Sequence, residues 1–257
     1  MLSLIERWGK HAALEVQEYV YLTTAAFRGV VTRPIYRHDI VEQFDEIGVG
    51  SLTVVLLAGL FTGAALASQS GLTLDQFGAR PVVGRLVSAS MIKELGPVLT
   101  ALMLTGRIGS GIAAELGSMV VTDQINALRA LGTDPVRKLV VPRVLAGICM
   151  APVLTVISDF VGILGGWVVA RYQLQVNSGL YWSSITKSLY TQDVWMGLIK
   201  PLVFGFLIVT VACHVGLRTT GGTAGVGKST TVSVVAGSVA VIASDFFVGQ
   251  FLIWLMY

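Results

Sequence analysis

Seven ionisable residues lie within or beside long apolar segments of the chain. A charged side chain at the centre of a bilayer costs roughly 2.5–3.5 kcal/mol on insertion scales, so such residues pair with one another or face a polar cavity. Their chemistry could bind a charged headgroup, carry protons, or hold helices together. The seven residues are Lys93, Glu94, Arg107, Glu115, Asp159, Lys200 and Asp245.

Lys93, Glu94 and Lys200 are the strongest candidates for a binding site. At a rise of about 1.5 Å per residue, Lys93 lies about 16 Å into a segment that begins at Val82, and Lys200 about 9 Å into one that begins at Val194. The three side chains can therefore converge in the outer half of a membrane, although Lys93 and Glu94 point about 100° apart on a helix. Two interpretations stay open: a site for an amphiphile with an anionic headgroup, and a Glu94–Lys200 pair that only fixes two helices.

The other four charges favour structural roles. Arg107 and Glu115 are two turns apart in a glycine-rich stretch, which predicts tight backbone packing with both charges near the cytoplasmic boundary. Asp159 and Asp245 have no carboxylate or histidine close in sequence, so we expect hydrogen bonds between helices rather than a proton relay. The glycines of the stretch are Gly106, Gly109, Gly111 and Gly117.

Residues 222–229 match the GxxxxGK[ST] pattern of a phosphate-binding loop, in which backbone amides hold phosphates and Lys228 would reach the terminal one. The context argues against this function, because the stretch joins two apolar segments and only 29 residues follow Lys228. We instead predict a glycine-rich cytoplasmic turn in which Ser229, Thr230 or Thr231 caps the last helix.

Composition defines the class of protein. The 257 residues are 54% apolar and 13% charged, about half the charged fraction of a soluble domain. Residues 1–46 carry 12 of the 33 charges, which leaves the rest too apolar to cover a soluble surface. We therefore predict an all-α integral membrane protein. A net charge of +3 without a basic, aromatic-rich run argues against nucleic acid, and the scattered histidines argue against a metal site.

An interfacial region and a transmembrane domain follow from the hydrophobic pattern. Residues 1–40 carry apolar side chains at steps of three and four, typical of a helix lying in the membrane interface, with packing on a soluble partner as the alternative. Residues 41–257 contain five segments long enough to span, and eleven basic residues against four place the N-terminus in the cytoplasm. The segments are 47–69, 82–121, 144–170, 194–217 and 232–254; the apolar positions are Leu4, Ile5, Trp8, Ala12, Val16, Tyr19, Val20 and Phe27.

A short amphipathic helix is predicted at about residues 121–132, between the second and third segments. Val121, Ile125, Leu128 and Leu131 recur at helical spacing, and Gly132 begins the stop signal. On the cytoplasmic face such a helix could sit in a groove of a partner, or it could be a connector lying on the membrane.

The run from Lys93 to Gly117 closely resembles the signature of the MlaE (YrbE) permease family. Asp123–Leu128, Asp134-Pro135, Pro142-Arg143 and residues 225–231 resemble it too, so that the resemblance covers the chain from about residue 40. Within the run, the signature residues are Gly96, Pro97, Gly106, Arg107, Gly109, Glu115 and Gly117.

This resemblance implies the homodimeric permease subunit of an ABC-type lipid transporter in a bacterial inner membrane. Two copies of a separate ATPase subunit would bind and hydrolyse ATP, so the chain itself would be no enzyme and hold no cofactor. A periplasmic MCE-domain protein sits above such permeases, and a small STAS-domain protein can bind the ATPase. Family members move phospholipids between the inner and outer membranes, and some relatives are linked to sterols.

The resemblance also implies roles for single residues. Lys93 and Glu94 match the charged pair of the family's lipid pocket, and Lys200 a basic residue nearby. Lys93 stands where arginine is common, which removes a bidentate fork for phosphate. Lys228 likewise stands where arginine is frequent, and Asp123 where glutamate is usual. The helix that docks on the ATPase corresponds to Asp123, Gln124, Ile125, Asn126, Ala127 and Leu128.

Two other functions remain as alternatives to a lipid-transporting permease. A stand-alone channel or ion-coupled carrier for an amphiphile would use Lys93, Glu94 and Asp245 and would need no ATPase. A structural membrane scaffold would tolerate the loss of Glu94 or Lys200 without any effect on lipids.

Overall fold

The computed structural model describes residues 2–31 and 36–256, with the side chains of residues 13–30 and 36–256. Within these ranges the regular elements are helices, and five helical paths are long and apolar enough to cross a membrane. The prediction of an all-α integral membrane protein is therefore confirmed. The five paths are Arg37–Asp75, Arg80–Val121, Val136–Tyr172, Thr191–Leu217 and Gly222–Met256.

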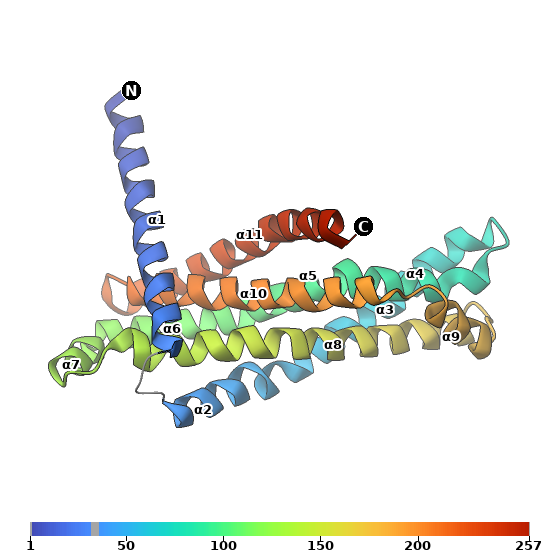
Figure 1. The fold of residues 1–257 in the computed structure, drawn as a ribbon, viewed down its shortest axis with the longest axis horizontal. Coiled ribbons are helices and arrows are strands. Elements are labelled where there is room, and N and C mark those ends of the chain that lie inside the picture. Colours follow the sequence, from blue (N-terminus) through green and yellow to red (C-terminus); the bar gives the residue numbers. More distant parts are fainter. Residues whose placement is uncertain (1, 32–35, 257) are drawn as a thin grey trace.

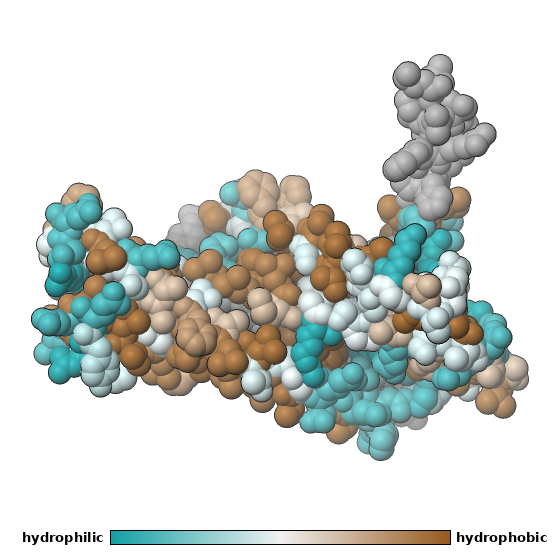
Figure 2. Space-filling view, turned by 180° about the vertical axis from the view of Figure 1, so that it is seen from behind, coloured by the Kyte–Doolittle hydropathy of each residue, from teal (hydrophilic) through white to brown (hydrophobic). Residues whose placement is uncertain are grey.

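The five paths run along one long axis (Figure 1). Short helices lie at the two ends of the bundle: α7 (Gln124–Ala130) at one end, and α9 (Ser178–Thr186) beside α4 at the other. The spanning helices are α2 (Arg37–Ile47) with α3 (Leu52–Asp75), α4 (Val83–Ser90) with α5 (Gly96–Leu104) and α6 (Ser110–Val121), α8 (Val141–Tyr172), α10 (Thr191–Leu217) and α11 (Gly222–Met256). Figure 2 shows hydrophobic residues along the middle of one face and hydrophilic residues gathered towards both ends, as a bilayer requires.

The second path is interrupted by two π-helical turns, Met91–Leu95 and Thr105–Gly109. The first turn ends two residues before Pro97, whose nitrogen has no hydrogen to donate to the preceding turn of an α-helix. π-helical turns are rare in proteins, and those that occur within α-helices frequently lie at functional sites. Here the first turn carries Lys93 and Glu94.

Helix α1 (Leu2–Val31) stands across the bundle axis near the end that carries α7 (Figure 1). Leu22 and Ala26 are buried, and the Tyr19 hydroxyl is hydrogen-bonded to the Thr210 hydroxyl of α10 at 2.7 Å. Val16 and Val20 are exposed, so the apolar side chains of α1 divide between the bundle and the outside, and the interfacial position of this helix stays a prediction. The side chains predicted to share that face at Leu4, Ile5, Trp8 and Ala12 lie outside the described residues.

Glycines bring α3 and α8 into backbone contact. A Cβ atom added to Gly63 would overlap the carbonyl oxygen of Gly162, and one added to Gly59 would lie 2.6 Å from the carbonyl oxygen of Ser158. Gly59 and Gly63, four residues apart on α3, therefore pack against Ser158 and Gly162, four residues apart on α8, as small residues in membrane helices often do.

Candidate functional site

Five ionisable side chains from three spanning paths form two ion-paired groups in the membrane domain, and because Lys93 and Glu94 are consecutive residues the two groups are together called the charge cluster. The Lys200 Nζ atom on α10 lies 2.6 Å from Glu94 Oε2 and 2.9 Å from Asp245 Oδ1 on α11. The Lys93 Nζ atom lies 2.6 Å from Asp193 Oδ1 in the first turn of α10. The structure thus brings the predicted site residues Glu94 and Lys200 together with Asp245, and it pairs the third predicted residue, Lys93, with Asp193.

Lys200 is the centre of the cluster. Its side chain has 0% exposure, and it contacts carboxylates on two neighbouring paths. Gly249 of α11 lies beside it, and a Cβ atom at that position would make an ordinary van der Waals contact with Nζ at 3.5 Å. A buried ammonium held by two carboxylates is well paired, whereas removing either kind of partner would leave an uncompensated charge in a low-dielectric environment.

Asp193 is a residue that the sequence reasoning did not select. Its side chain is buried, and besides contacting Lys93 it accepts a 3.2 Å hydrogen bond from the backbone N–H of Tyr190, closing a capping box at the start of α10. An acidic residue three positions into a helix is an ordinary signal for the start of a helix. The sequence pattern therefore indicated where α10 begins and did not indicate that Asp193 pairs with Lys93.

The π turn and its neighbours fix where Lys93 and Glu94 point. Gly197 lets α10 approach, since a Cβ there would lie 2.6 Å from the carbonyl oxygen of Ile92. A Cβ at Gly96 would overlap Asp159 Oδ1 on α8, so the signature glycine is needed for this packing. That oxygen is buried and accepts no hydrogen bond, so the interhelical bond predicted for Asp159 is not made by this atom.

Asp245 also differs from its prediction in kind. It contacts a neighbouring helix through an ion pair with Lys200, at 2.9 Å, where a hydrogen bond between helices was predicted. The distance qualifies as an ion pair, while Oδ1 lacks the alignment of a directed hydrogen bond.

Arg107 and Glu115 bond to neighbouring helices, in agreement with the structural role predicted for them. The Arg107 Nη1 atom donates to Ser51 Oγ at 2.8 Å and to the Glu46 carbonyl at 3.1 Å, and Glu115 pairs with the buried Arg143 at 2.6 Å.

Tight packing holds at only part of the surrounding glycine-rich stretch. A Cβ at Gly117 would lie 2.7 Å from Thr219 Oγ1. At Gly106 and Gly111 it would meet nothing within 4 Å, so the prediction of tight backbone packing is wrong there. At Gly109 the nearest atoms would be 3.7 Å away, although the Ser233 hydroxyl donates to the Gly109 carbonyl at 2.9 Å.

Helix α7 is shorter than the predicted helix at residues 121–132. Val121 ends α6, and Asp123 turns the chain in the left-handed region with φ 57°, so that α7 covers Gln124–Ala130. The Asn126 side chain donates to Asp123 Oδ1 at 3.0 Å and steadies this turn. Ile125 is buried against the bundle, whereas Leu131 is 80% exposed beyond the end of the helix. The exposed residues of the segment are Asp123, Gln124, Asn126 and Ala127, with Leu128 half-buried.

Residues 222–229 form the first two turns of α11 and not a loop. Gly221 and Gly222 have positive φ values of 88° and 66°, so the chain reverses there and the helix begins at Gly222. The prediction that Ser229, Thr230 or Thr231 caps this helix is therefore wrong. Thr230 instead donates to the Gly227 carbonyl at 2.6 Å within the helix, as a mid-helix threonine commonly does.

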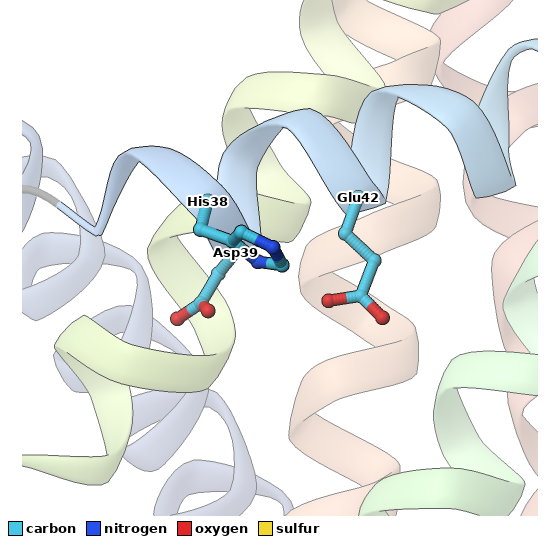
Figure 3. A group of neighbouring side chains, drawn as sticks. All are labelled: His38, Asp39 and Glu42. Atoms are coloured by element: carbon cyan, nitrogen blue, oxygen red, sulfur yellow. The ribbon is translucent and has the colours of Figure 1, made fainter.

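His38, Asp39 and Glu42 bring three potential metal-ligating atoms within 4.8 Å of one another on α2 (Figure 3). The spacing of the histidines alone could not indicate this group, because its other members are carboxylates. Asp39 is ion-paired with Lys138, whose ammonium also lies 4.6 Å from the centre of the Tyr36 ring. A side-chain cation therefore already balances one of the two carboxylates.

An all-α, multi-pass membrane protein with a charge cluster inside its spanning helices is the class that this fold and site define. The sequence profile described as Permease MlaE matches residues 40–251. The chain belongs to this permease family.

Individual relatives agree with that assignment. The chain is 38% identical over 255 residues to a probable ABC transporter permease protein of Rickettsia typhi, covering 98% of each. It is 37% identical over 224 residues to the intermembrane phospholipid transport system permease protein MlaE of Haemophilus influenzae, covering 86% of each. It is 34% identical over 217 residues to the chloroplastic protein TRIGALACTOSYLDIACYLGLYCEROL 1 of Arabidopsis thaliana, covering 84% of this chain and 62% of that protein.

Proposed function

We propose that this transporter permease moves phospholipids, or related lipids, between the inner membrane and the periplasm or outer membrane. The observation that carries the proposal is the intramembrane cluster around Lys200, in which Glu94 stays 51% exposed and Lys93 33% exposed. Charged groups at this depth are costly, and groups that stay accessible are placed to meet a polar headgroup whose acyl chains remain in an apolar environment. The name of the Haemophilus influenzae relative supports phospholipid as the substrate.

The chain acts as a homodimer and draws its energy from a separate ATPase subunit that binds ATP. Helix α7 supports this part of the proposal: it lies at one end of the bundle and leaves Gln124, Asn126 and Ala127 exposed. Movement of a docked ATPase would pass through α7 into α6, and along the same path to Lys93 and Glu94. The chain itself needs no cofactor.

Further partners and the orientation complete the proposal. A periplasmic MCE-domain protein would receive or deliver the lipid, and a STAS-domain protein would bind the ATPase. The N-terminus and α7 lie on the cytoplasmic side of a bacterial inner membrane, which the distribution of basic residues supports.

Co-purification combined with reconstitution tests this function. The tagged chain expressed with its neighbours is expected to recover an ATPase subunit, and transport of a labelled phospholipid in proteoliposomes should require ATP. Substituting the exposed Asn126→Arg should reduce ATPase recovery, whereas the matched exposed position Lys187→Glu, at the end of α9, should not. A chain that recovers no ATPase yet transports alone would favour the ion-coupled carrier instead.

A further inference from the structure

The two most exposed groups of the charge cluster are one positive group, Lys93, and one negative group, Glu94. We infer that the site selects a zwitterionic phospholipid headgroup, its phosphate near Lys93 and its ammonium near Glu94, over a headgroup with net negative charge. This inference rests on the proposed function and names the lipid class for the same site.

The charge of the whole cluster favours this class. Two ammonium groups, of Lys93 and Lys200, face three carboxylates, of Glu94, Asp193 and Asp245. With all five ionised the cluster carries a net charge of minus one. An anionic headgroup would add a second uncompensated negative charge in a region of low dielectric, where like charges repel strongly.

Accessibility decides which of these groups a headgroup can meet. Lys200 has 0% exposure and already holds two carboxylates, so its ammonium is closed to a phosphate unless those pairs break. Asp193 is equally hidden, with 2% of its side chain exposed. The most exposed groups are Glu94, at 51%, and Lys93, at 33%, while Asp245 is exposed to 23% and would add a second carboxylate that favours an ammonium.

The arrangement of Lys93 and Glu94 fits two opposite charges on one small headgroup. They are consecutive residues in the Met91–Leu95 π turn, and each is oriented by a different partner: Lys93 by Asp193, and Glu94 by Lys200. Glu94 contacts Lys200 through Oε2. A primary ammonium approaching the exposed part of this carboxylate would meet the excess negative charge of the cluster, and a phosphate at Lys93 would compete with Asp193 for the ammonium. A zwitterionic headgroup as a whole would therefore add no net charge to the cluster.

A lipid-retention experiment on the assembled transporter tests the inference. The complex is reconstituted in vesicles with equal amounts of phosphatidylethanolamine and phosphatidylglycerol carrying identical acyl chains, re-extracted, and its retained lipid is quantified by mass spectrometry. We expect about five-fold enrichment of phosphatidylethanolamine, the ratio that a single accessible ion pair can supply.

Two variants and a control separate headgroup selection from folding. Glu94→Gln should lower the enrichment to about one-fold, because the accessible carboxylate is lost. Asp193→Asn should also lower it, because Lys93 would then offer its full charge to an anionic headgroup. Glu42→Gln, an exposed carboxylate on α2, should leave the ratio unchanged.

The outcomes distinguish this inference from the proposed function. Retention of both lipids in equal amounts, or enrichment of phosphatidylglycerol, in the wild-type complex would overturn the inference and leave lipid transport standing. Retention of no lipid at all, with no lipid transfer by the same complex, would overturn the proposed function and the inference together.

Discussion

Replacing Lys200 by methionine should destabilise the folded chain in a predictable way. The substitution removes the ammonium that lies 2.6 Å from Glu94 and 2.9 Å from Asp245 and leaves two carboxylates close together. Methionine fills a similar volume, so the effect reports charge and not a cavity. Breaking a buried ion pair by removing one partner costs about 3–5 kcal/mol.

The exposure of the two carboxylates sets the size of the effect within that range. Glu94 is 51% exposed and can regain water, while Asp245 is 23% exposed and can do so only in part. We therefore expect Lys200→Met to lower the free energy of unfolding by about 3 kcal/mol, the lower end of the range for buried pairs. Chemical unfolding in detergent micelles measures this loss, and Lys187→Met, at an exposed position, provides the matched control with a change within about 0.5 kcal/mol.

A triple variant makes the same prediction refutable. Glu94→Gln and Asp245→Asn, added to Lys200→Met, remove the orphaned charges and should recover at least half of the lost stability, because a buried ionic group replaced as a whole is often nearly neutral. A single variant that loses less than about 1 kcal/mol, or a triple variant as unstable as the single one, would show that Lys200 does not hold these helices through its charge.

Three further predictions follow from individual contacts. Gly63→Ala should destabilise the chain by at least about 2 kcal/mol, since its Cβ would overlap the Gly162 carbonyl, whereas Gly106→Ala, with open space around it, should change the melting midpoint little. Asp123→Val should weaken ATP-driven transport more than Asp123→Asn, because a β-branched residue strains the left-handed turn before α7; equal activity of the two variants would contradict the role of this turn. Burial raises the pKa of Tyr181, whose hydroxyl donates to the Ile163 carbonyl at 2.9 Å, so the folded state keeps a proton that the unfolded chain loses above about pH 10, and stability should fall as the pH rises beyond that value. Tyr181→Phe should cost about 1 kcal/mol at neutral pH and flatten the alkaline decline, and an unchanged alkaline profile in this variant would argue against Tyr181 as its source.

Much of the site could be predicted from the sequence, because a charge inside an apolar segment is costly wherever it lies. That cost alone singles out Lys93, Glu94, Lys200 and Asp245, and counting residues along the segments predicts that the first three can converge in the outer half of the membrane. Which of them pair depends on how α10 and α11 are rotated, and no local pattern encodes that rotation. Asp193 was not predicted as a site residue because it lies in the first turn of a helix, where an acidic residue is explained by helix capping.

Helix ends show the same limit of local patterns. The apolar spacing continues from Val121 through Ile125, yet the chain turns between them at Asp123, because aspartate tolerates the left-handed conformation better than most residues. At the start of α11 the helix is longer than predicted. The chain reverses at Gly221 and Gly222, so the helix begins seven residues before Ser229, the earliest of the predicted capping residues. The five spans themselves were predictable, since length and hydropathy depend on composition and little on tertiary contacts.

Transfer of a labelled phospholipid by the reconstituted complex tests the central claim most directly. Vesicles that contain the permease with its ATPase should transfer the lipid only when ATP is supplied, and Glu94→Gln should slow the transfer while Glu42→Gln leaves it unchanged. Transfer that needs neither ATP nor the ATPase, or that proceeds at the wild-type rate in the Glu94→Gln complex, would contradict an ATP-driven permease that moves lipid through the Lys93, Glu94 and Lys200 cluster.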